Sequence, residues 1–126
     1  MRAWVVLVAL AGCKEAPECR RFDAVWSANG AAWSRLVATS NEERDWRARA
    51  SDAETLANTL RDDALDAPPN ARKLRPEVME LQSHVREMGV AARAIAEGGP
   101  DRKAKWAEEH AEADRALAAI HRRCKK

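Results

Sequence analysis

Apolar residues recur along this chain at steps of three and four, in four stretches that Pro, Gly and Ser-Asn breaks separate. This spacing places apolar side chains on one face of a helix, whereas a half-buried strand would alternate, and no stretch of the chain alternates. The apolar share of 46% comes mainly from alanine, with one Phe and no Tyr, a composition that favours helix over strand. We therefore predict an all-α fold. Because short connections make neighbouring helices antiparallel, the expected architecture is an antiparallel up-down-up-down four-helix bundle.

The breaks set the expected limits of the helices. The four helices are expected roughly from Glu18 to Ala38, from Ser40 to Ala67, from Pro76 to Gly98-Gly99, and from Pro100 onward. Ser40 and Glu43 have the spacing of a capping box, and Pro68-Pro69 cannot continue a helix. Gly30 is tolerated inside the first helix at some cost. The alternative to the break at Ser40 is one long fused helix.

The first residues are typical of an export signal, because Met1-Arg2 is followed by the apolar run 3–10 and then by small residues. That run is too short to span a bilayer, which needs about 20 apolar residues. Leu10-Ala11-Gly12-Cys13 resembles the lipobox of bacterial lipoprotein signal peptides. The resemblance implies a removable signal peptide at 1–12, a lipid on Cys13, a tether at 13–19 and a folded body at 20–126. A secretory signal with an incidental cysteine is the alternative.

The lipobox resemblance also implies a location and a partner. The lipid would anchor the protein to a membrane with its body facing the periplasm. In that family an Asp after the lipidated cysteine often retains the protein in the inner membrane, whereas this chain has Lys14. We therefore expect the outer membrane rather than the inner one, and an unknown envelope protein as partner.

Charge patterning argues against nucleic acid as a partner. The 22 basic and 20 acidic residues nearly cancel and are spread along the chain, whereas a phosphate-binding surface needs clustered Lys and Arg. The one basic cluster is 122–126. We interpret it as cations placed favourably at a helix C-terminus rather than as a site for lipid headgroups.

Cys19 and Cys124 form an even pair once Cys13 carries lipid. In an oxidising compartment such a pair usually forms a disulfide. Cys19 precedes the first helical pattern and Cys124 ends the last, and in an up-down-up-down bundle these ends lie at the same pole. We therefore predict a Cys19–Cys124 disulfide, with a pair of reactive thiols as the alternative.

The histidines and acidic pairs do not form a recognisable catalytic or metal site. His110 and His121 share one helical face, but they lie about 16 Å apart along the axis and cannot bind one metal together. Each histidine, including His84, is expected at the boundary of the core, hydrogen-bonded or in contact with water. The acidic pairs Asp62-Asp63 and Glu108-Glu109 are expected on solvated faces.

Several enzyme classes are excluded by spacing. No Glu-x-x-His pair of a di-iron bundle, no Cys-x-x-Cys-His of attached haem and no zinc spacing occurs in the chain. We expect no catalytic site, and hence a protein that is not an enzyme.

From about Ala64 onward the chain resembles the cytochrome b562 family and, more distantly, the cytochrome c-prime bundles. The residues that carry this resemblance are Ala64-Leu65-Asp66-Ala67 followed by Pro68-Pro69, Pro76-Glu77, Ala94-Ile95-Ala96-Glu97-Gly98 and His121-Arg122-Arg123. They cover about half of the chain. The resemblance implies a b-type haem between the helices, with His121 as an axial ligand to the iron.

The haem pocket implied by this resemblance would be lined by Phe22, Trp26, Trp106, Leu117 and Ile120. The family's second ligand is a methionine in the first helix, but this chain has no Met between Met1 and Met79. Each of these apolar residues also has a role in a plain helical core. We therefore expect a structural or protein-interaction lipoprotein without a cofactor, with haem binding and electron transfer through His121 as the alternative.

Overall fold

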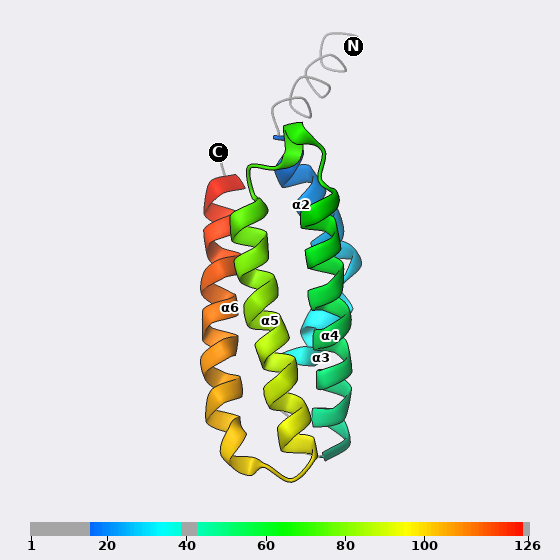
Figure 1. Ribbon diagram of the computed structural model, residues 1–126, viewed down its shortest axis with the longest axis vertical. Helices are drawn as coiled ribbons and strands as arrows, with labels where there is room; N and C mark the ends of the chain where they lie inside the picture. Colours follow the sequence, from blue (N-terminus) through cyan, green and yellow to red (C-terminus); the bar gives the residue numbers. More distant parts are fainter. Residues whose placement is uncertain (1–15, 39–42, 125–126) are drawn as a thin grey trace, which may run out of the picture.

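The computed structural model describes residues 16–38 and 43–124, and the regular structure in these ranges is all helical. The helices are α2 (Pro17–Ala28), α3 (Gly30–Leu36), α4 (Glu43–Asp66), α5 (Arg75–Ala96) and α6 (Lys103–Cys124), with 3₁₀ turns η1 (Pro69–Ala71) and η2 (Pro100–Arg102). Figure 1 shows α4, α5 and α6 as long helices lying side by side. The prediction of an all-α fold is confirmed. The predicted signal peptide, Cys13 and the capping residue Ser40 lie outside the described residues.

The first helical stretch is broken, so the prediction of a single helix from Glu18 to Ala38 is wrong. Asn29 leaves helical geometry, with φ −111° and ψ 13°, and its side-chain amide donates a hydrogen bond to the carbonyl of Val25 at 2.8 Å. Asn side chains compete with the helix for backbone hydrogen bonds in this way. Gly30 follows directly and adds backbone freedom. The result is two short helices, α2 and α3. Because α2 begins at Pro17, the folded body starts earlier than the predicted residue 20.

The connection between α4 and α5 is fixed by two arginines. The last carbonyls of a helix have no partner within it. Arg72 donates from Nε to the carbonyl of Ala67 at 2.9 Å, and Arg75 donates from Nε to the carbonyl of Ala64 at 2.8 Å. These side chains stabilise the end of α4 before Pro69 starts η1, and the predicted stop of this helix near Ala67 is confirmed.

The end of α5 follows the glycine signal in the sequence. Gly98 has φ +96°, a left-handed conformation that costs glycine little. The N–H of Gly99 donates to the carbonyl of Ala94 at 2.9 Å, and that of Gly98 to the carbonyl of Ile95 at 3.0 Å. This pair of bonds is a Schellman cap. The predicted stop of the third helical stretch at Gly98-Gly99 is confirmed.

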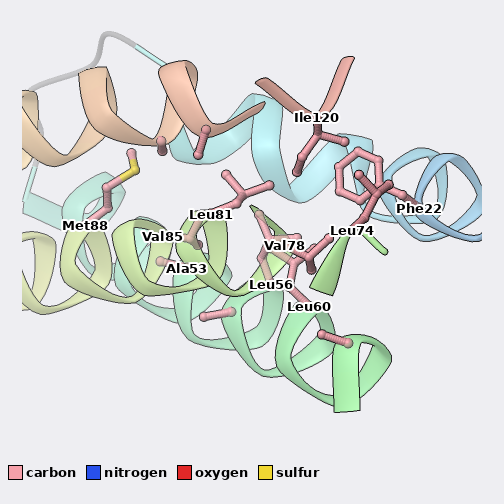
Figure 2. Packing of buried hydrophobic residues seen from close by; sticks show 14 of the residues in the cluster. Phe22, Ala53, Leu56, Leu60, Leu74, Val78, Leu81, Val85, Met88 and Ile120 are labelled. Carbon is pink, nitrogen blue, oxygen red and sulfur yellow. The ribbon is translucent and has the colours of Figure 1, made fainter. Parts of the chain in front are cut away.

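The core runs along the inside of the helices and receives side chains from α2 to α6 (Figure 2). Its largest fully buried side chains are Phe22, Leu36, Leu56, Leu60, Leu81, Val85, Met88 and Ile120. Helices α4 and α5 approach closely at Gly89, where an added Cβ would lie 2.9 Å from the Cβ of Ala53. Glycine at this point therefore sets the spacing of the two central helices.

The two ends of the described chain are joined by a disulfide. Cys19 in α2 and Cys124 at the end of α6 are bonded, with their Cα atoms 5.6 Å apart. Figure 1 shows the start of α2 and the end of α6 at the same pole of the molecule. The predicted disulfide is confirmed, and Cys19 lies in the first turn of α2. Beside it, Arg123 forms an ion pair with Glu77 of α5.

Among the described residues, no helix combines the length and apolar character that a membrane crossing requires.

We predict that the Cys19–Cys124 disulfide contributes substantially to stability. It closes a loop with a sequence separation of 105 residues, for which the chain-entropy model gives at most about 4–5 kcal/mol. Replacing both cysteines by serine should lower the free energy of unfolding by about 2–5 kcal/mol, measured by denaturant titration with circular dichroism. Reductant should destabilise the native chain but leave the double variant unchanged. Equal unfolding midpoints for the oxidised and reduced native chain would contradict the prediction.

Candidate functional site

The predicted haem ligand His121 lies on the surface near the disulfide pole. Its side chain is exposed, and its ring meets Phe22 edge-on, with centroids 6.4 Å apart. Phe22 is 2% exposed and stacks on Trp26 at 5.7 Å. The structure therefore brings His121, Phe22 and Trp26 together, whereas Trp106 lies near the start of α6, at the opposite pole (Figure 1).

A row of aromatic rings follows the seam between the broken first stretch and α6. We define this aromatic row by consecutive ring contacts with centroids 5.2–6.4 Å apart. In order, its members are His121, Phe22, Trp26, Trp33, His110, Trp106 and Trp46. Edge-on and tilted ring pairs contribute stability beyond that of the apolar area they bury. The sequence placed most of these residues on apolar faces, but it did not show that they form one row.

The aromatic row and the disulfide determine whether a haem could fit beside His121. Phe22 and Ile120 are buried beside His121, at 2% and 0% exposure, and Cys19–Cys124 holds α2 and α6 together at this pole. Leu117 is only partly buried, against the same core. A porphyrin between these helices would have to displace Phe22 or separate α2 from α6. The described residues at this pole therefore do not fit a haem in the position that the cytochrome resemblance implies.

Glu109 is the main polar residue that the sequence analysis placed wrongly. It was expected on a solvated face but is 7% exposed. Its carboxylate accepts a hydrogen bond from Nδ1 of His84 at 2.7 Å and another from Nζ of Lys105 at 2.8 Å. The signal was in the spacing, because position 109 is three residues after Trp106 and four before Ala113, on the inward face of α6.

Lys105 and His84 determine the ionisation of Glu109. Burial alone raises the pKa of this carboxyl, but the hydrogen bonds from Lys105 and His84 and their charges outweigh it, so the pKa lies below the ordinary glutamate value. His84 is half-buried and hydrogen-bonded, as expected for a histidine at the boundary of the core. This network links α5 to α6.

The acidic pair Asp62-Asp63 is also divided between surface and interface. Asp62 is exposed, whereas Asp63 is partly buried and lies 2.7 Å from Nε of Arg21. Burial raises the pKa of Asp63, Arg21 lowers it, Asp66 raises it, and the net pKa is raised. The prediction of a solvated face is therefore correct for Asp62 and wrong for Asp63, which docks α2 onto α4.

Potential metal ligands are dispersed. Within 16–38 and 43–124, no three His, Cys, Asp or Glu side chains are grouped closely enough to hold a metal ion. His110 instead lies in the aromatic row, with Nε2 3.3 Å from the carboxylate of Asp114.

Comparison with protein families, curated proteins and solved structures finds no match for this chain.

We predict that Glu109→Gln destabilises the protein at neutral pH. The folded carboxyl has a lowered pKa, so its contribution is present above the ordinary glutamate pKa of about 4.3 and is lost as pH falls through the folded value. The variant should lose about 1–2 kcal/mol at pH 7, as expected when hydrogen bonds to a charged group are weakened. Its difference from the native protein should vanish in acid. Denaturant titrations across this pH range measure the effect.

Glu108→Gln is the matched control because Glu108 is the exposed neighbour on the same helix. It should change the free energy of unfolding by less than about 0.5 kcal/mol. An equal loss in both variants, or a Glu109→Gln effect that grows in acid, would contradict the assigned role of Glu109.

Proposed function

We propose that this chain is a lipid-anchored protein of the bacterial cell envelope with a structural or protein-interaction role and no catalytic site. The anchor is the lipidated Cys13 of the Leu10-Ala11-Gly12-Cys13 lipobox. The body is proposed to be an antiparallel up-down-up-down four-helix bundle whose first helix is α2 and α3 together. It faces the periplasm, and its membrane is the outer one.

The Cys19–Cys124 disulfide is the observation that carries this proposal. Disulfides form and persist in oxidising compartments and are rare in the cytosol. This one joins the helix that follows the lipobox to the last helix of the chain, so the folded body suits the compartment to which the signal would export it. The aromatic row supports a structural reading, because its rings pack on one another rather than around an open pocket.

The lipid anchor is tested by expressing the full chain in a bacterium with a radiolabelled fatty acid. Native protein should incorporate label and fractionate with the outer membrane, whereas Cys13→Ser should remain unlabelled and retain its signal peptide. Cys19→Ser is the control, because it removes a cysteine outside the lipobox and should leave labelling unchanged. An unlabelled native protein that is released in soluble form would overturn the proposal.

Haem binding through His121 is the alternative reading, and an absorption titration of the full chain with haem tests it. Since Phe22 fills the space beside His121, we expect no sharp Soret band at stoichiometric haem in the native protein. A Soret shift that saturates at one equivalent, and that His121→Ala abolishes but His110→Ala does not, would establish a b-type haem protein instead.

A further inference from the structure

The fold gathers positive charge at the pole that holds the disulfide. We define the disulfide pole by residues 17–21, 63–78 and 121–124, which are the start of α2, the α4–α5 connection with its flanking turns, and the end of α6 (Figure 1). These ranges hold seven basic and four acidic residues. The exposed ones are the basic Arg20, Arg72, Lys73, Arg122 and Arg123 and the acidic Asp66.

The residues that directly adjoin the pole in the sequence add to this charge. Residues 14–15, before Ala16, are one lysine and one glutamate, and residues 125–126, after Cys124, are two lysines. The disulfide pole and these flanking residues therefore contain ten of the 22 basic residues but five of the 20 acidic ones, a net charge of +5. Because the whole chain has a net charge of +2, the rest of it is net negative. The fold thus concentrates at one pole basic residues that are spread along the sequence.

Ion pairs and the disulfide fix the segments of the pole relative to one another. Arg21 of α2 lies 2.7 Å from Asp63 of α4, and Arg123 of α6 pairs with Glu77 of α5. Two of the four acidic residues therefore link helices and are partly buried. Within the three ranges of the pole, Asp66 is the one acidic residue that is fully exposed, so the surface of the pole is predominantly basic.

The proposed lipid anchor would bring this pole to a membrane. Cys13 lies three residues before Ala16, where the described body begins, and three extended residues span at most about 11 Å. The field of a charged surface falls off over a Debye length, which is about 8 Å at physiological ionic strength. Whatever path residues 13–15 take, the start of α2 therefore lies close to lipid headgroups.

We propose that the disulfide pole is a binding surface for anionic phospholipid headgroups, which orients the body on the membrane. This inference rests on the proposed lipid anchor and adds to it a defined face. Lys and Arg beside an anionic lipid surface each strengthen the attraction severalfold, and the planar guanidinium of Arg donates two hydrogen bonds to phosphate oxygens. The sequence alone favoured helix-terminal cations at 122–126, but the structure adds Arg20, Arg72 and Lys73 from two other segments to that cluster.

Acetylation of lysine side chains measures whether the pole contacts lipid. Protein isolated from bacterial membranes after expression of the full chain is reconstituted on preformed vesicles, either of phosphatidylcholine alone or of equal parts phosphatidylcholine and phosphatidylglycerol. It is treated with uncharged acetic anhydride, and mass spectrometry follows each lysine. Acetylation of Lys73 should be about 5-fold slower on the anionic vesicles. Salt at about 1 M, where the Debye length is about 3 Å, should remove this difference.

Lys103 is the internal control, because it is exposed at the start of α6, at the opposite pole. It should react at the same rate on both vesicles. Arg122→Glu reverses one exposed charge of the disulfide pole and should reduce the difference at Lys73 to less than about 2-fold. Arg102→Glu is the matched control variant, because Arg102 is an exposed arginine of η2. It should leave the difference unchanged.

Equal acetylation of Lys73 on the two vesicle types, or equal effects of Arg122→Glu and Arg102→Glu, would overturn the proposal. Flotation of the vesicles separates this failure from failure of the anchor. A native protein that floats with phosphatidylcholine vesicles but shows no difference at Lys73 has its anchor and lacks headgroup binding. A native protein that floats with neither vesicle lacks the anchor as well, and both proposals fall.

Discussion

The docking of α2 and α3 onto α4 and α6 is the interaction on which the rest of this structure depends. These two helices have 12 and 7 residues, too few to be stable in water alone. They are held on α4 by close helix packing and the Arg21–Asp63 ion pair, and on α6 by the aromatic row and the Cys19–Cys124 disulfide. Without that docking, Phe22 and Leu36 would leave the core, and the inner faces of α4 and α5 would be exposed to water.

The remaining helices form a more self-sufficient unit. Helices α4 and α5 approach closely at Gly89, and Arg75 satisfies carbonyls at the end of α4. The Glu109 network then joins α5 to α6 through charged hydrogen bonds. The molecule therefore combines a central packed pair with a broken outer stretch, and the disulfide compensates for the weakness of that stretch.

Sequence reasoning found what depends on local chemistry. The apolar periodicity of an alanine-rich chain predicted the helices, Gly98 predicted the end of α5, and the even pair of cysteines predicted the disulfide. It missed features that depend on tertiary packing, or on competition between a side chain and the backbone for hydrogen bonds. The break at Asn29 arises because its amide outcompetes the helix locally, which composition does not reveal. The burial of Glu109 and Arg49 depends on partners from other helices. Charged side chains are usually exposed, and for these two residues that expectation is wrong.

Hydrogen exchange of backbone amides, compared between oxidised and reduced protein, tests the central claim most directly. Amides in the stable core exchange only through global opening, whereas weakly docked segments exchange through local opening. The account predicts that reduction removes protection from α2 and α3 first, while the facing parts of α4 and α5 keep most of theirs. Uniform loss of protection across all helices, or unchanged protection in α2 and α3, would show that the aromatic row and disulfide do not hold the first stretch in place.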